Sequence, residues 1–163
     1  MSILNGVNPN DLRLNDLYQE VILDHNKRPR NFGRVEDANH SAHGKNPLCG
    51  DDYFLYLATD GSGKIRKVGF EGSGCAISKA SASMMTTLVQ GKSVKEAETL
   101  KDNFIHLLTD NMVSKETISN VGSLKIFEGV RQFPIRVKCA ALIWRTLEAA
   151  LKSEKDKKEV STE

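Results

Sequence analysis

The sequence of 163 residues contains only three cysteines, Cys49, Cys75 and Cys139. An odd and sparse set of cysteines is a poor framework for disulfides, so we expect free thiols, as in a reducing compartment. No apolar run approaches the roughly eighteen residues that span a membrane. The N-terminus also lacks the basic and apolar segments of a secretory signal, and we therefore expect a cytoplasmic protein.

The sequence has no large excess of charge of either sign. It contains 23 basic and 21 acidic residues, which gives a net charge of +2, and 39% of its residues are hydrophobic. This balance gives no indication of a nucleic-acid or membrane partner. The length favours one domain with a proper core, which we place at residues 1–151. Residues 152–163 are charged with little to bury, so we expect a flexible tail.

The hydrophobic pattern predicts several helices and one β-hairpin. Segments 53–58 and 64–71 flank a Gly-rich turn and are typical of an antiparallel hairpin, whereas 26–50 is expected to be a loop or a short edge strand. Helical spacing begins near Asn10, after Gly74, after Ser93, around 124–130, and at about Cys139. A hairpin followed by several helices indicates an α+β fold, not a βαβ alternation.

Each cysteine lies in a context that suits a metal ligand. Cys49 and Asp51 are separated by a single glycine, which lets the backbone curl so that both side chains can face one ion. Cys75 follows a Gly-Ser-Gly segment at a predicted helix start, where the backbone N–H groups favour a thiolate. Cys139 is likewise expected at a helix start. Taken alone, each cysteine is more typical of a small buried core residue than of a metal ligand.

Three thiolates and one carboxylate supply the four ligands that a tetrahedral zinc ion needs. Such a site carries a formal charge of −2, which the neighbouring cations Arg136 and Lys138 would offset. The same two cations are also compatible with an ordinary solvated face. Thiolate-rich zinc sites are usually closed and structural, so a zinc ion that only stabilises the fold is the plain alternative.

Several separated motifs resemble, in order, the iron–sulfur assembly proteins of the IscU/NifU N-terminal family over about residues 12–151. The motifs are Asp24-His25 with Pro29-Arg30-Asn31-Phe32-Gly33, Asn46-Pro47-Leu48-Cys49-Gly50-Asp51, Gly72-Ser73-Gly74-Cys75-Ala76-Ile77-Ser78-Lys79 and Cys139-Ala140-Ala141-Leu142-Ile143-Trp144.

Within this family the chain resembles the SufU branch more than the IscU scaffolds. Scaffolds have a histidine before the third cysteine, where this chain has Lys138. The interval from Cys75 to Cys139 is longer than in scaffolds, as in the SufU branch. Segment 133–138 also replaces the Leu-Pro-Pro-Val-Lys motif that the chaperone of the scaffolds reads.

The resemblance implies a SufE/NifU-like fold, with a small antiparallel sheet of about three strands packed against several helices. It implies a zinc ion held by Cys49, Asp51, Cys75 and Cys139. It also implies two partners, a pyridoxal-phosphate-dependent cysteine desulfurase of the SufS type and a downstream Suf assembly scaffold. The resemblance to the SufU branch further implies that a desulfurase histidine replaces Cys49 on zinc and so frees its thiolate.

Our hypothesis is a zinc-dependent sulfurtransferase that takes persulfide sulfur from the desulfurase for iron–sulfur cluster biogenesis. Cys49 is the expected acceptor because it lies on a flexible Gly-rich loop, and Arg136 and Lys138 are expected to stabilise the persulfide. The alternative is a scaffold on which a [2Fe–2S] cluster is assembled and transferred. A third reading is a structural zinc domain that only binds a partner. The sequence leaves open the metal in the cell and the oligomeric state.

Overall fold

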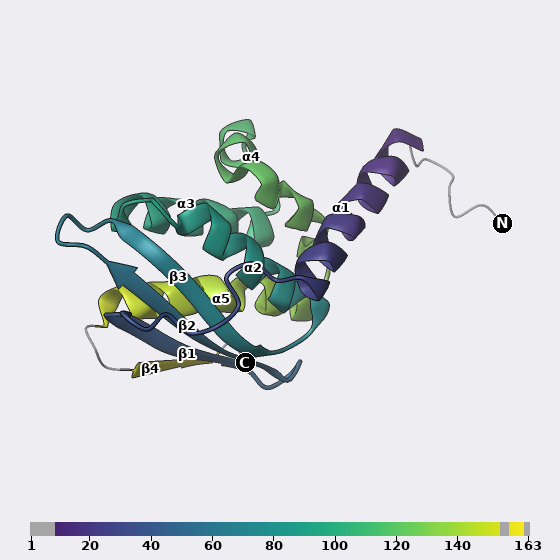
Figure 1. Ribbon diagram of the computed structural model, residues 1–163. Helices are drawn as coiled ribbons and strands as arrows, with labels where there is room; N and C mark the ends of the chain where they lie inside the picture. The colour runs from purple at the N-terminus through teal and green to yellow at the C-terminus, as the bar shows by residue number, and fades with distance from the viewer. Residues whose placement is uncertain (1–8, 154–156, 162–163) are drawn as a thin grey trace.

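The computed structural model describes residues 9–153 and 157–161 and shows an α+β fold, as expected (Figure 1). In chain order the elements are α1 (Pro9–Lys27), β1 (His40–Asn46), β2 (Asp51–Thr59), β3 (Ile65–Ser73), α2 (Ala76–Val89), α3 (Val94–Thr109), α4 (Lys115–Val121), the 3₁₀ helix η1 (Gly122–Gln132), α5 (Pro134–Lys152) and β4 (Lys157–Ser161). Among the described residues, no helix is both long and apolar enough to cross a membrane.

The sheet has the strand order β3-β2-β1-β4. The predicted hairpin is confirmed as β2 and β3, which pair antiparallel with Leu55 opposite Phe70. Strand β1 also pairs antiparallel with β2, and Ala42 lies opposite Leu55. We expected at most an edge strand in this part of the chain, but β1 lies inside the sheet because β4 pairs with its other side.

Residues Lys157–Ser161 lie in the segment that we expected to be a flexible tail. In the structure they form strand β4, which pairs in parallel with β1. Main-chain hydrogen bonds to the otherwise free side of β1 can order a segment that has little apolar surface, because a strand edge offers unpaired N–H and C=O groups. The remaining tail residues 154–156 and 162–163 lie outside the described part. The domain boundary at residue 151 stays a prediction.

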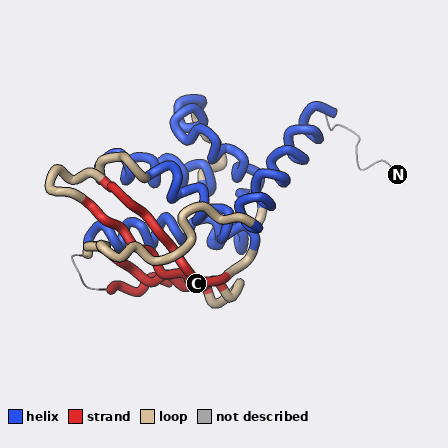
Figure 2. Tube along the Cα trace, viewed as in Figure 1, coloured by secondary structure: helices blue, strands red, loops and turns tan. Residues whose placement is uncertain are grey.

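The helices cover one face of the sheet, with α5 lying across β1 and β2 (Figures 1 and 2). Gly44 allows this close approach, because a Cβ atom there would collide with Thr146 on α5. Behind the sheet, Trp144 is fully buried and its ring lies 5.1 Å from that of Phe104 on α3. The core thus fixes α5 against both the sheet and the other helices.

The starts of α2 and α3 agree with the sequence prediction, whereas the start of α5 does not. Cys75 caps α2, and Ser93 and Glu96 form the reciprocal capping box of α3. The prediction that the last helix starts at about Cys139 is wrong, because α5 begins at Pro134. Proline suits the first helical turn, since its φ angle is already helical and its missing N–H would have no partner there. Cys139 consequently lies in the second turn of α5.

Candidate metal centre

The side chains of Cys49, Asp51 and Cys139 converge. One ligand atom from each lies within 4.8 Å of the others, and this is the arrangement expected of residues that hold a metal ion. The Sγ atoms of Cys49 and Cys139 are 2.8 Å apart. The three residues come from the turn between β1 and β2, the start of β2, and α5.

A tight turn places Cys49 and Asp51 on the same side of the chain. Asn46 and Asp51 are paired across β1 and β2, so only residues 47–50 connect the two strands. The turn is closed by a hydrogen bond from Cys49 N to Asn46 O at 3.2 Å. Gly50 has a φ of 71°, which favours glycine, and this agrees with the curled backbone predicted from the sequence.

The Asp51 carboxylate is buried and held on both of its oxygens. Oδ1 accepts hydrogen bonds from Cys75 N at 2.9 Å and from Ser78 Oγ at 3.0 Å. Oδ2 accepts from Asn46 Nδ2 at 3.3 Å. These donors come from both the β1 end and the start of α2, so the carboxylate is fixed in one orientation beside the two cysteine sulfurs.

Cys75 lies next to this group, but its sulfur is not one of the converging ligand atoms. Its Sγ instead accepts a hydrogen bond from Ser78 N at 3.4 Å and so caps α2. Its backbone N–H is the group that reaches Asp51. The structure therefore brings three of the four predicted ligands together. The fourth, Cys75, is joined to this group by the hydrogen bond from its backbone N–H to Asp51. The complete set of four stays a prediction.

Cys139 is the deepest of the three cysteines, with 1% of its surface exposed. Burial raises the pKa of its thiol strongly, and the contact with Cys49 and the neighbouring Cys75 and Asp51 act in the same direction. A buried thiol surrounded by other acidic groups stays protonated unless a cation compensates for the charge.

The residues present fit a divalent metal ion such as zinc. Thiolates and a carboxylate are accepted zinc ligands, and two of the three converging side chains are buried, where gathered negative charge is costly without a cation. Gly74 leaves the space beside Asp51 open for Ser78 and Tyr53, because a Cβ atom there would lie 2.5–2.6 Å from all three side chains. A glycine at position 74 thus lets Ser78 and Tyr53 lie close to the Asp51 carboxylate.

Three polar residues of this site were not singled out in the sequence. Asn46 donates to Asp51 and Cys139, Ser78 donates to Asp51, and the buried Tyr53 hydroxyl lies 3.0 Å from Ser78 Oγ. Asn46 stands three positions before Cys49, and Ser78 stands at the capping distance after Cys75, which are the signals that could have identified them. Tyr53 gives no such signal, because it follows the ordinary alternation of β2.

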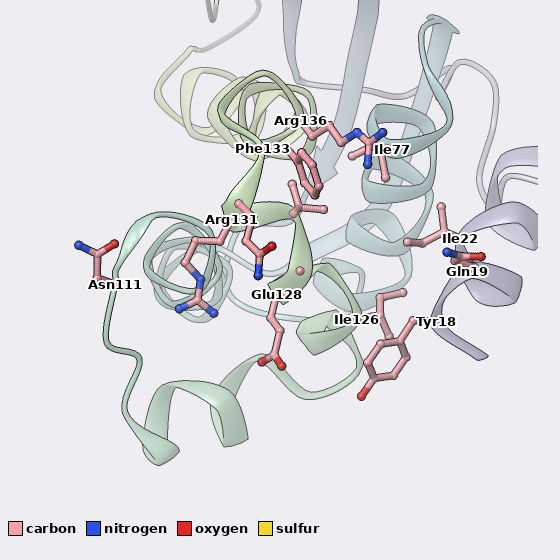
Figure 3. Close-up of a pocket in the computed structure, with 13 residues that line it drawn as sticks. Tyr18, Gln19, Ile22, Ile77, Asn111, Ile126, Glu128, Arg131, Phe133 and Arg136 are labelled. Carbon is pink, nitrogen blue, oxygen red and sulfur yellow. The ribbon is translucent and has the colours of Figure 1, made fainter. Parts of the chain in front are cut away.

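The predicted persulfide-stabilising residues lie on the first turns of α5, beside Cys139. Arg136 is exposed and its guanidinium lies 4.7 Å from the centre of the Phe133 ring. Arg136 and Phe133 border a pocket of about 880 Å³ between α1, η1 and the starts of α2 and α5, where Figure 3 also shows Tyr18 and Ile77. Lys138 is half-buried directly before Cys139. The role predicted for Arg136 and Lys138 stays a prediction.

Comparison with known proteins identifies the family. A family model described as the NifU-like N-terminal domain matches residues 17–140. The iron–sulfur cluster assembly scaffold protein IscU of Streptococcus pyogenes serotype M1 is 41% identical over 142 residues, which cover 86% of each chain. The zinc-dependent sulfurtransferase SufU of Bacillus subtilis strain 168 is 40% identical over 143 residues, covering 86% of this chain and 93% of that protein.

A solved structure shows the same fold. The crystal structure of an iron–sulfur cluster assembly scaffold protein for the SUF system from Fervidobacterium islandicum AW-1 superposes with a TM-score of 0.75 and 38% identity, covering 82% of this chain and 95% of that one. The family model matches well over half of the sequence, and the relatives are similar over most of their own length. The chain belongs to the family of NifU-like N-terminal domains, which includes the IscU and SufU proteins.

Proposed function

We propose that the chain is a zinc-dependent sulfur acceptor for iron–sulfur cluster assembly. It takes sulfur from the persulfide of a pyridoxal-phosphate-dependent cysteine desulfurase of the SufS type and passes it to a downstream Suf assembly scaffold. The observation that carries this proposal is the convergence of Cys49, on a turn, with the buried Asp51 and Cys139. The name of the Bacillus relative, a zinc-dependent sulfurtransferase, supports the same function.

In this proposal Cys49, Asp51, Cys75 and Cys139 hold the zinc ion. When bound, zinc would supply the positive charge that keeps these sulfur atoms deprotonated at neutral pH and would lower their reactivity until a partner arrives. Asp51 is already oriented for this role by its three hydrogen bonds. Cys75 would exchange its capping bond with Ser78 N for the metal, while its backbone stays bonded to Asp51.

Cys49 is the sulfur that receives the transferred atom. It is half-buried, and its neighbour Leu48 is 61% exposed, so an incoming persulfide reaches the turn from solvent. Cys139 is covered by the protein and cannot be reached in this way. The Cys49 thiolate attacks the terminal sulfur of the donor persulfide, the bond between the two donor sulfurs breaks, and the donor cysteine leaves as a thiolate.

Arg136 and Lys138 supply positive charge close to this transfer. Both precede Cys139 on α5, and a persulfide arrives as an anion at neutral pH. Cations near an anionic encounter raise the rate of association and stabilise the approaching charge. We assign them this steering role, and Arg136 is the better placed of the two because it is exposed.

The second candidate is a scaffold for a [2Fe–2S] cluster. It is favoured by the name of the Streptococcus relative and by the thiolate-rich ligand set, which also suits iron–sulfur clusters. Lys138 argues against the scaffold, because it stands where scaffolds have the histidine that offers an additional ligand. Anaerobic loading with iron and sulfide separates the two functions, since an assembled cluster has a strong visible absorption spectrum and the sulfur acceptor develops none.

The test of the proposed function is alanine production from cysteine by the partner desulfurase under mild reductant. Zinc-loaded protein should stimulate the reaction strongly, and the Cys49→Ala variant should not. Asp51→Ala should stimulate only when excess zinc is supplied, because it loses a metal ligand and keeps the acceptor. Stimulation by Cys49→Ala would rule out this acceptor, and no stimulation by any form would favour the scaffold or a purely structural zinc domain.

A further inference from the structure

The Asn46 side chain is fully buried at the end of β1, beside the candidate metal ligands, with 0% of its surface exposed. Its Nδ2 group donates to Asp51 Oδ2 at 3.3 Å and to Cys139 Sγ at 3.5 Å. Among the hydrogen bonds of the described residues, Asn46 Nδ2 has none to Cys49. One amide group thus contacts two of the three converging ligands and discriminates between the two cysteines.

The other end of the same amide is unsatisfied. Within the described part of the chain, the buried Asn46 Oδ1 atom has no hydrogen-bond partner. Buried polar atoms are normally paired, and leaving one unpaired is costly, so a leucine of similar size would suit packing better. The amide is therefore explained by what its Nδ2 group does toward Asp51 and Cys139, and not by packing.

We propose that Asn46 is a positioning residue that holds Asp51 and Cys139 as the fixed metal ligands and leaves Cys49 as the ligand that exchanges. This inference rests on the proposed function. Hydrogen bonds to anionic ligand atoms orient them and stabilise their charged form. Asp51 and Cys139 receive such a bond from Asn46, whereas Cys49 is held by its turn and by the metal. Two cysteines of identical chemistry become unequal in this way.

The first test compares Asn46→Leu with the native protein and with a matched control, Asn39→Leu. Asn39 lies just before the opposite end of β1, and its side chain bonds only to Thr59 in the described contacts, so its replacement disturbs the same strand without touching the site. Zinc affinity is measured by competition with a chromophoric chelator. We expect Asn46→Leu to lose about 10–100-fold in affinity, and Asn39→Leu to lose stability without this change.

The absorption spectrum of a cobalt-loaded sample separates a positioning role from a purely structural one, because loss of stability alone does not shift its bands. Removing an N–H donor from a metal-bound thiolate raises the energy of its electrons, so the sulfur-to-cobalt charge-transfer band of Asn46→Leu should shift to longer wavelength. The control should show the native band. If Asn46→Leu does not fold, Asn46→Ala serves instead, because it removes the amide and adds no volume. A folded variant with native zinc affinity and a native band overturns the inference.

A double-mutant cycle tests the inequality of the two cysteines. The loss of zinc affinity caused by Asn46→Leu should be as large in a Cys49→Ala background as in the native protein, and smaller in a Cys139→Ala background. The reason is that, of these two cysteines, only Cys139 shares a hydrogen bond with Asn46. An equal loss of zinc affinity in both backgrounds would show that Asn46 does not distinguish Cys139 from Cys49. These measurements need no desulfurase. If the native protein stimulates the desulfurase while Asn46→Leu binds zinc normally, only this inference is refuted. If Asn46→Leu loses zinc affinity while the native protein does not stimulate the desulfurase, only the proposed function is refuted.

Discussion

The Cys49 and Cys139 sulfur atoms lie 2.8 Å apart, although the residues are 90 positions apart in the sequence. Both are free thiols, and the contact exists because the turn between β1 and β2 rests on the second turn of α5. Two thiols in contact can either share a metal ion or be oxidised together. The state of the metal site therefore decides the redox behaviour of this pair.

Mild oxidation with diamide should link Cys49 to Cys139 in the metal-free protein, because their sulfurs are already in contact. Zinc loading should prevent the link, since both sulfurs are then metal ligands. Peptide mapping by mass spectrometry without reductant detects the product. A Cys75→Ser variant is the control and should form the same link. A disulfide that includes Cys75 in the native protein would contradict the geometry.

Removal of zinc by a chelator should lower the melting temperature of the native protein. A ligand present at 100 times its dissociation constant stabilises a fold by about 2.7 kcal/mol, which for a chain of this size corresponds to about 5–10 °C. Differential scanning calorimetry measures the shift. Asp51→Asn should show a smaller zinc-dependent shift, because it loses a charged ligand in a site of the same shape. An equal melting temperature with and without zinc would argue against a resident ion.

Gly74→Ala should damage the site directly. The added Cβ atom would lie 2.5 Å from Asp51 Oδ1 and from Ser78 Oγ, so the carboxylate must move away from its donors. We expect a loss of about 1–3 kcal/mol in the free energy of unfolding, together with weaker zinc binding. Gly129→Ala is the control, because its Cβ atom meets nothing within 4 Å. Equal zinc affinities of the two variants would count against the role of Gly74.

Glu148 on α5 pairs with the buried Lys101 on α3, away from the metal site. The hydrogen bond from Lys101 lowers the pKa of Glu148 below its ordinary value of 4.5. A carboxyl with a lowered folded-state pKa stabilises the fold above its unfolded pKa, and this contribution disappears as the pH falls through the folded pKa. The ion pair should therefore be lost on acidification below about pH 4.5.

Glu148→Gln should reduce the free energy of unfolding by about 1–2 kcal/mol at pH 7 and make it less dependent on pH below 4.5. Urea unfolding at a series of pH values measures both effects. Glu98→Gln on α3 is the control and should keep the acid dependence of the native protein. A Glu148→Gln variant with the full native acid dependence would show that this pair is not its source.

Local sequence signals were sufficient for several elements. The hairpin followed from a Gly-rich turn between apolar segments. The α3 start followed from Ser93, which the structure shows in a capping box with Glu96 three positions later. The start of α5 lies earlier than the predicted position at about Cys139, because Pro134 occupies the first turn of the helix, where proline is well tolerated. Strand β4 carries no apolar pattern and depends on main-chain pairing with β1.

By itself the sequence determined the α+β class, the resemblance to the family, and the choice of Cys49, Asp51, Cys75 and Cys139 as candidate ligands of one site, because these depend on residue types and on the local motif around each residue. Only the tertiary structure decided that Cys139 is buried, that the Cys75 sulfur caps α2, and that Asn46 bonds to Asp51 and Cys139. Hydrogen bonds between β1, β2 and α5 join segments far apart in the chain. Their geometry is set by how α5 packs on the sheet, which no local pattern specifies.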